Sequence, residues 1–186
     1  MSTTTLFVDL LIIGMQVGAL LLLVVLTFLG EQHAGLDKLK GWEGTLGVLA
    51  LPVVYPLGMF VDNLADFLLD GWRKEIRNKY LRNPSANVSD LLMRAKDDKL
   101  AEYFEYLRIR IRISRSTALN FTLIALFFPV FASRYLGGAG MMKWNAGAAV
   151  SVASLLLAAL ALFTWIGVTE TYYKKLQRGL EIVDRT

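Results

Sequence analysis

The chain has 186 residues, 55% of them hydrophobic, and a formal net charge of +4 from 20 basic and 16 acidic side chains. A soluble domain averages about 45–50% apolar residues, and here they are gathered into long blocks separated by stretches that hold nearly all of the charge. The sequence has no cysteine and a single histidine, His33, which excludes disulfides, thiolate metal sites, cysteine nucleophiles and histidine-pair metal sites within one chain.

Four apolar segments are each long enough to cross a lipid bilayer as a helix. A spanning helix needs about 20 predominantly apolar residues, because the hydrocarbon core is about 30 Å thick and each residue rises about 1.5 Å. The segments cover residues 6–30, 45–64, 117–132 and 146–168. We therefore predict an all-α integral membrane protein with four transmembrane helices. The first segment has no preceding basic residue and no small-x-small cleavage site, so we expect a retained helix and not a signal peptide.

The distribution of basic residues predicts the orientation of these helices. The loop 71–116 and the tail 169–186 together hold sixteen Lys and Arg residues, whereas the opposite side holds four. The positive-inside rule therefore places the loop, the tail and both termini in the cytoplasm. All four tryptophans fall at the predicted membrane boundaries, namely Trp42 and Trp144 outside and Trp72 and Trp165 inside. The small size and the lack of a targeting sequence favour a bacterial inner membrane.

The loop 71–116 is too long for a turn, and we predict that it forms a basic cytoplasmic helical hairpin. Its first part continues a helical pattern, residues 83–87 (Asn-Pro-Ser-Ala-Asn) interrupt it, and Ser89 or Asp90 caps the next helix. Residues 107–113 alternate apolar and arginine side chains with period two, which is typical of a strand. A strand would leave unpaired edge groups beside the membrane. Helix is therefore preferred, with strand as the alternative.

Two charged stripes are the most informative feature of the sequence. An acid stripe at the inner end of the second span consists of Asp62, Asp66 and Asp70. A basic stripe before the third span consists of Arg108, Arg110, Arg112 and Arg115. Spacings of three and four residues put the three acids on one helix face and Arg108, Arg112 and Arg115 on one face of the next helix, so these faces meet if the helices are antiparallel. They then form an interhelical or intersubunit clamp. Alternatively, the acids line a water-filled vestibule, as charge rings do in cation channels, or simply face solvent.

The basic stripe also predicts a binding function that does not depend on the acid stripe. Its position beside the headgroups predicts contact with anionic lipid, worth about 1 kcal/mol per basic residue near the surface. The sharper alternative is a docking site for a phosphorylated ligand, a nucleic acid or an acidic partner. Six acidic residues in the same loop argue against nucleic acid.

Small residues and prolines inside the spans predict close helix packing. Gly14 and Gly18 in the first span, and Gly147 and Ser151 in the fourth, let neighbouring backbones approach closely, within one chain or between chains. Gln16 is positioned to form a hydrogen bond across a helix pair or to line a pore. The prolines in the second span are Pro52 and Pro56. They predict a kink, which serves either as a hinge or only for packing.

No catalytic motif is present, so we expect neither an enzyme nor a cofactor. The leading hypothesis is a small homo-oligomeric membrane protein that forms a channel or membrane-perturbing pore, with the basic hairpin as gate or sensor. The alternative is a non-conducting membrane anchor or sensor subunit that docks a soluble cytoplasmic partner, for example in a bacterial antiphage defence system. A minor structural subunit of a larger membrane complex is the third hypothesis.

Overall fold

The computed structural model describes residues 3–29, 43–81, 87–95, 98–135 and 140–183. Every element in these ranges is an α-helix, which confirms the predicted all-α class. The helices are α1 (Thr3–Leu29), α3 (Glu43–Tyr80), α4 (Val88–Ala95), α5 (Asp98–Tyr135) and α6 (Gly140–Val183). The four long helices are each long and apolar enough to cross a membrane. His33, Trp42 and residues 83–86 of the predicted interruption at 83–87 lie outside the described residues.

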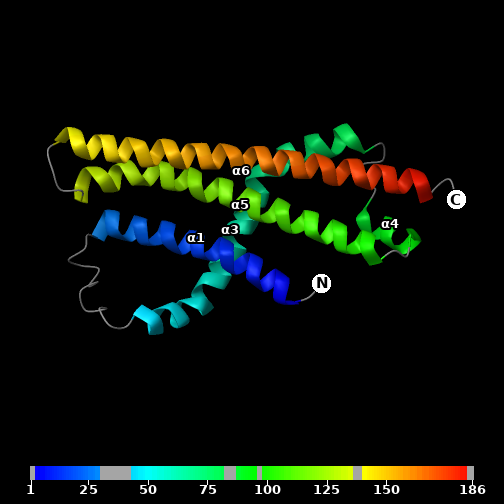
Figure 1. Cartoon of the computed structure of the whole chain (residues 1–186), viewed down its shortest axis with the longest axis horizontal. Coiled ribbons are helices and arrows are strands. Elements are labelled where there is room, and N and C mark those ends of the chain that lie inside the picture. Colours follow the sequence, from blue (N-terminus) through cyan, green and yellow to red (C-terminus); the bar gives the residue numbers. More distant parts are fainter. Residues whose placement is uncertain (1–2, 30–42, 82–86, 96–97, 136–139, 184–186) are drawn as a thin grey trace.

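The long helices form an elongated bundle. In Figure 1, α5 and α6 run side by side along the long axis, and α1 lies along the other side of α5. Helix α3 crosses this layer, starting beyond α1 and ending beyond α6. Helix α3 contacts α1, α5 and α6. Polar residues along α3 can therefore meet residues of all three helices.

Three of the helices are much longer than a bilayer is thick. Helices α3 and α5 have 38 residues each and α6 has 44, which corresponds to lengths of about 57 and 66 Å, against a hydrocarbon core of about 30 Å. Residues 71–80 continue α3, residues 98–116 begin α5, and residues 169–183, predicted as a tail, continue α6. Residues 107–113 are helical, so the strand alternative is wrong: the alternating pattern lies within one uninterrupted helix.

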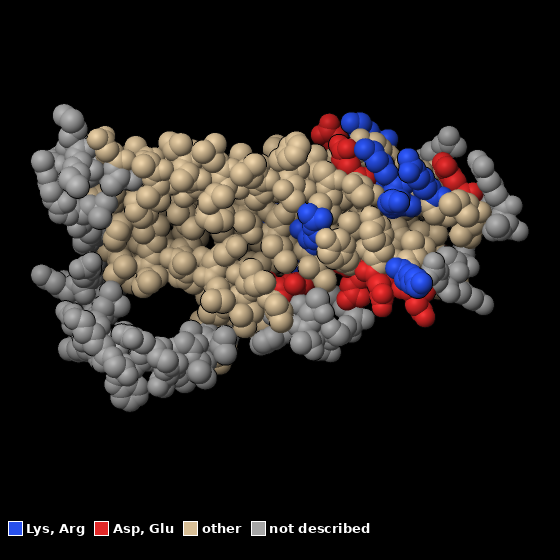
Figure 2. All heavy atoms as spheres, viewed as in Figure 1, with Lys and Arg blue, Asp and Glu red and all other residues tan. Residues whose placement is uncertain are grey.

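The extensions of the helices pack into a small core of their own. It contains Leu81, Leu91, Phe104 and Leu176, which come from the end of α3, from α4, from α5 and from α6. We call the part of the molecule formed by residues 71–81, 87–95, 98–116 and 169–183 the charged end. Figure 2 shows that, on the face in view, the charged side chains gather over this part, whereas the described surface of the other half is uncharged. The hydrophobic effect drives such a core only where water is the solvent.

The apolar helices bury little of their surface against one another. Between 17% and 33% of each apolar window is buried within the chain. Phe60, Phe67 and Phe163 are between 66% and 79% exposed. Exposed apolar surface of this extent is unfavourable in water and is favourable in contact with lipid or another apolar partner. The structure therefore supports a multi-pass membrane protein.

The tryptophans divide between surface and interior. Trp72 is 54% exposed, in keeping with a ring at the membrane boundary. Trp165 is 1% exposed, so its indole packs in the interior of the bundle and does not face lipid; its depth at the inner membrane boundary stays a prediction. The side chains of Trp42 and Trp144 lie outside the described part.

Helices α1 and α3 cross at two glycines. A Cβ atom on Gly14 would collide with the backbone of Val54, and one on Gly58 would collide with the carbonyl of Leu10. Val54 lies between Pro52 and Pro56, through which α3 runs without interruption. The proline segment is thus the part of α3 that α1 touches most closely.

The other predicted packing residues lie in looser contacts. A Cβ atom on Gly147 would stand 3.1 Å from the Cβ of Ala132 on α5, and one on Gly18 would be 4.0 Å from the side chain of Val54. The Ser151 hydroxyl is buried without a hydrogen-bond partner among the described residues. Gly14 and Gly147 therefore serve packing within the chain.

Candidate functional site

The acid and basic stripes meet in the interior, between α3 and α5. The Arg115 guanidinium donates to Asp62 Oδ1 at 2.7 Å and to the backbone carbonyl of Asp62 at 3.2 Å, and it also pairs with Asp66. Arg112 Nε lies 3.0 Å from Asp62 Oδ2, and Ser116 Oγ lies 3.4 Å from Asp62 Oδ1. We call Asp62, Asp66, Arg112 and Arg115 the arginine–aspartate clamp.

The burial of the side chains indicates which of these ion pairs contributes most to stability. The side chains of Arg115 and Asp62 are only 9% and 12% exposed, so solvent and salt screen their attraction little. A buried pair of this kind fixes geometry, and removing one partner leaves the other charge uncompensated, at a cost of about 3–5 kcal/mol. Pairs between exposed charges are worth about 0–1 kcal/mol.

The third acid of the stripe turns to its own helix. Asp70 pairs with Arg73 and, at 2.6 Å, with Lys74, which lie one turn further along α3. Arg73 also reaches Asp66, with a distance of 3.1 Å from Nη1 to Oδ1. Arg73 was not singled out from the sequence. Its position seven residues after Asp66 is the signal that indicates this contact, because residues at that spacing share one helix face.

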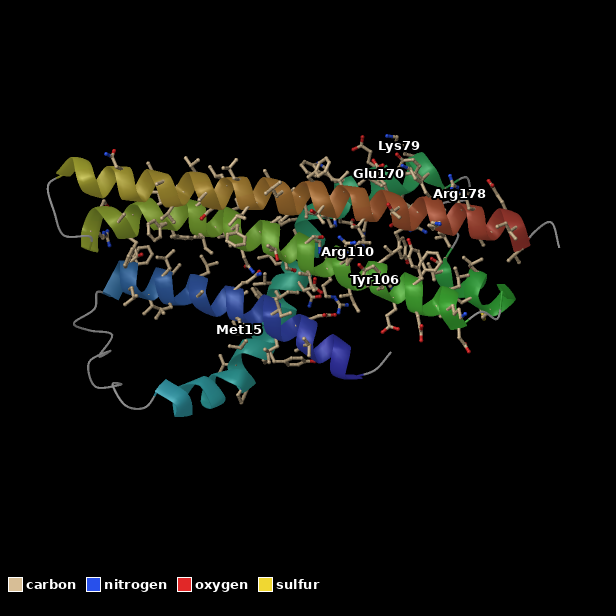
Figure 3. All side chains as sticks on the ribbon, in the orientation of Figure 1. Met15, Lys79, Tyr106, Arg110, Glu170 and Arg178 are labelled. Atoms are coloured by element: carbon tan, nitrogen blue, oxygen red, sulfur yellow. The ribbon has the colours of Figure 1, made fainter. Side chains whose placement is uncertain are left out.

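Two members of the basic stripe stay outside the clamp. Arg110 lies on the outer side of α5, where its guanidinium is 3.3 Å from the Tyr106 hydroxyl and 5.6 Å from the centre of the ring (Figure 3). Arg108 makes no ion pair within the part of the chain that the structure describes, and it lines three hollows of the charged end. Arg112 and Arg115 are thus engaged in the clamp, Arg108 continues their face of α5 toward the charged end, and Arg110 lies on a different, exposed side of the helix.

A polar layer continues from the clamp into the apolar part of the bundle. Gln16 Oε1 on α1 accepts hydrogen bonds from Asn120 Nδ2 and Thr117 Oγ1 on α5, both at 3.2 Å. Asn120 is fully buried. The expected hydrogen bond from Gln16 across a helix pair is thus present. Arg112, Ser116 and Asn120 are spaced by four residues and hence share one face of α5. This spacing is the sequence signal that indicates a role for Asn120.

An acidic side chain of α1 lies buried beside this polar face. Asp9 is 5% exposed, and its Oδ2 atom has no hydrogen-bond partner among the described residues. The guanidinium group of Arg112 attracts this carboxylate electrostatically. The first span thus adds an acid to the polar face of α5 near the clamp.

Four basic side chains line a hollow of about 280 Å³ next to the clamp, which we call the basic cleft. Its lining residues come from α3, the start of α4, α5 and α6, and they are Arg73, Lys74, Arg77, Asn87, Val88, Arg108, Tyr172, Tyr173 and Leu176. None of these is acidic. A second hollow of about 360 Å³ shares Arg73, Arg108 and both tyrosines with the cleft and reaches the clamp at Asp62 and Asp66.

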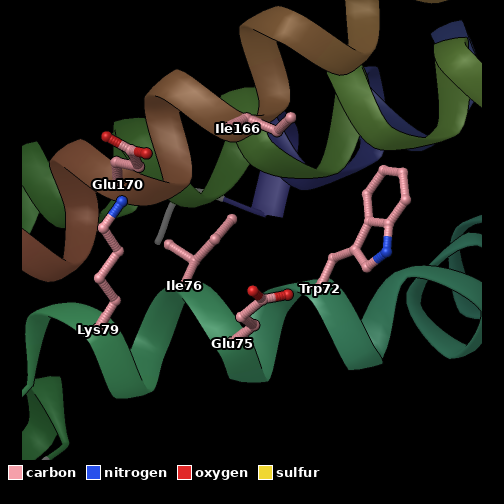
Figure 4. A pocket seen from close by; sticks show the side chains of 6 residues that line it. All are labelled: Trp72, Glu75, Ile76, Lys79, Ile166 and Glu170. Atoms are coloured by element: carbon pink, nitrogen blue, oxygen red, sulfur yellow. The ribbon is translucent and has the colours of Figure 1, made fainter.

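A groove between α3 and α6 differs from the basic cleft in its charge. It has a volume of about 230 Å³ and is lined by Trp72, Glu75, Ile76, Lys79, Ile166 and Glu170. Figure 4 shows Lys79 extending from α3 toward Glu170 on α6. Its lining holds two carboxylates and one ammonium group, so unlike the basic cleft it does not attract an anion.

No protein family, curated protein or solved structure matches the chain. The candidate site therefore rests on its own chemistry. That chemistry is a buried and largely compensated clamp, a polar layer that leads inward from it, and an outward-facing basic cleft whose lining holds four cations and no acid.

Proposed function

We propose that this multi-pass membrane protein is a non-conducting anchor or sensor subunit whose charged end receives a soluble anionic ligand or partner. The observation that carries the proposal is the basic cleft, in which Arg73, Lys74, Arg77 and Arg108 converge without an acidic lining residue. Clefts lined by charge of one sign concentrate ligands of the opposite sign. The charged end also has a packed core, which gives such a cleft a fixed shape.

The cleft is coupled to the membrane-spanning part through shared side chains. Arg73 lines the cleft and contacts Asp66, which in turn pairs with Arg115 at the start of the apolar part of α5. A ligand that draws Arg73 toward itself weakens its contact with Asp66. This chain of contacts is a physical route by which binding at the charged end influences the bundle.

The homo-oligomeric pore is the second candidate, and one observation favours it. The polar face of α5 runs from Arg112 past Ser116 to Asn120, a distance of about 12 Å along the helix, and it enters the apolar part of the bundle. Two other features that suggest a pore instead make contacts within the chain. Asp62 is compensated by arginine, and Gly14 packs on Val54.

Ion flux separates the two candidates. Purified protein is reconstituted into liposomes that are loaded with a fluorescent ion indicator. We expect no flux above that of empty liposomes, whereas a pore gives flux that Asp62→Asn or Asp66→Asn alters. Flux that depends on Asp62 would establish the pore and overturn the anchor.

Partner binding is tested in intact cells by cross-linking and affinity purification. We expect Arg108→Glu to abolish recovery of an acidic partner or ligand. Arg110→Glu is the matched control, because it makes the same charge change two residues away on α5, outside the cleft. Equal recovery with both variants would contradict a role for the basic cleft.

A further inference from the structure

We infer that the basic cleft binds the phosphate group of a small water-soluble molecule. The inference deepens the proposed function and rests on it, since it names the ligand class of the same charged end. Four cationic side chains line a cleft of about 280 Å³. Guanidinium groups present several N–H donors in a planar fork that matches the oxygens of a phosphate.

The cations approach the cleft from two different helices. Arg73 and Arg77 are four residues apart on α3 and so share one face, and Arg108 comes from α5. Donors that converge from separate elements surround an anion, whereas donors along a single helix only flank it. The cleft thus has the arrangement of a binding site and not of a solvated basic face.

The start of α4 also lines the cleft. Asn87, which precedes the helix, and Val88, its first residue, are both lining residues. The first N–H groups of a helix have no partner within the helix, and the helix dipole makes this end partially positive. This end therefore adds backbone donors to the side-chain cations, which is how helix N-termini hold phosphate.

At least one of the cations that line the cleft has no acidic partner among the described residues. Arg112 and Arg115 are engaged by the acids of the clamp, and Arg73 and Lys74 are held by Asp70. Arg108 has no ion pair within the described ranges, and it lies where the cleft and the neighbouring hollow of about 360 Å³ meet. A phosphate beside Arg108 supplies the missing counter-ion.

An aromatic wall gives the cleft a defined shape. The rings of Tyr172 and Tyr173 stand 5.3 Å apart at 89°, and Tyr172 packs edge-on at 5.3 Å against Phe104 of the core. Their hydroxyls are donors of the kind that phosphate accepts. The cleft and its neighbour together reach the size of small-molecule sites, about 300–1,000 Å³. There is thus room for the body of a phosphorylated small molecule as well as for its phosphate.

The position of the cleft along α5 favours a soluble source of phosphate over a lipid headgroup. Arg108 lies nine residues before residue 117, the predicted start of the third span, which places it about 13 Å outside the hydrocarbon. The headgroup layer on one side of a bilayer is about 5–8 Å thick. Lipid phosphates therefore lie closer to the clamp than to the cleft.

The test uses the full chain in nanodiscs and inorganic pyrophosphate as the probe. Titration calorimetry in phosphatidylcholine nanodiscs is expected to show saturable binding. Arg108→Gln should weaken it by about tenfold or more, the effect of losing a charge-assisted contact, whereas Arg110→Gln should leave it unchanged. A second set of nanodiscs contains phosphatidic acid, whose headgroup is a phosphate monoester; we expect pyrophosphate to bind there with the same affinity.

Three outcomes would overturn the inference. The first is no saturable binding of pyrophosphate to the wild-type chain, and the second is the same loss of affinity with Arg110→Gln as with Arg108→Gln. The third is competition by phosphatidic acid, which would assign the cleft to a lipid headgroup. Circular dichroism of each variant excludes misfolding as the cause. If pyrophosphate does not bind but Arg108→Glu still abolishes partner recovery in cells, the proposed function stands without a phosphate ligand. If both experiments are negative, the proposed function fails as well.

Discussion

Arg115 on α5 and Asp62 on α3 form a salt bridge of 2.7 Å that is almost completely buried, although the residues are 53 positions apart in the sequence. Arg115 donates both to the carboxylate and to the backbone carbonyl of Asp62. Arg112 and Ser116 contact the same carboxylate. The pair therefore joins the end of the apolar part of α3 to the start of that of α5 and fixes how the two helices are rotated about their axes.

Removing the arginine of this pair should destabilise the fold strongly. Arg115→Gln leaves a buried carboxylate with Arg112 as its remaining cation, and the expected loss is about 3–5 kcal/mol in the free energy of unfolding. The loss is measured by reversible unfolding in mixed detergent micelles. Arg110→Gln, on the outer side of the same helix, should change the free energy by less than about 0.5 kcal/mol.

The double variant tests whether the effect belongs to the pair. Asp62→Asn combined with Arg115→Gln removes both charges, so it should cost less than the sum of the two single variants. Additive losses would show that the two side chains act independently and that the salt bridge does not carry the effect.

The crossing of α1 and α3 should not tolerate a methyl group at Gly14. Gly14→Ala places a Cβ atom against the backbone of Val54, and because backbone cannot yield as a side chain does, we expect a loss of about 1–3 kcal/mol. Gly71→Ala is the matched control, since nothing lies within 4 Å of its Cβ position. It should stabilise α3 by about 0.5–1 kcal/mol. Equal effects in thermal unfolding would contradict the close crossing.

The core of the charged end should loosen when its largest aromatic side chain is truncated. Phe104 is 1% exposed and packs with Leu91 and Leu176, so Phe104→Ala is expected to cost about 3–5 kcal/mol locally. Limited proteolysis should then cleave α4 more rapidly while the apolar helices remain protected. Met93→Ala, at a position that is 69% exposed, should be cleaved at the wild-type rate. Unchanged cleavage of Phe104→Ala would argue against a packed core.

The contact between Gln16 and Asn120 should contribute modestly to stability. Hydrogen bonds between membrane helices average about 0.6 kcal/mol and reach about 1.7 kcal/mol, and Asn120→Ala removes one of the two donors to Gln16. We therefore expect a loss of about 1 kcal/mol in unfolding experiments. Leu126→Ala, on the exposed side of α5, serves as the control. A loss above that of Arg115→Gln would mean that the polar layer, and not the clamp, holds α5 in place.

The sequence by itself determined the class of the protein. Apolar blocks of bilayer length predict helices regardless of the tertiary context, because the backbone must satisfy its own hydrogen bonds in lipid. The four-residue spacing of Asp62 and Asp66 likewise fixes that they share a helix face. The shared face of Arg112 and Arg115 follows on similar grounds, but that the acid and basic stripes face each other was one of several alternatives left open by the sequence. Which end of the bundle is cytoplasmic stays a prediction from the distribution of Lys and Arg.

Only the tertiary structure decided what each charged side chain does. Arg108 and Arg115 are alike in the sequence, yet one lines an open cleft and the other is buried on Asp62. The difference depends on the path of α3, which crosses the bundle and brings its acids to one face of α5. Long-range packing sets that path, through the contact of Gly14 with Val54 and the core around Phe104. Local periodicity states which side chains share a face, but the neighbour of that face is fixed only when distant helices pack.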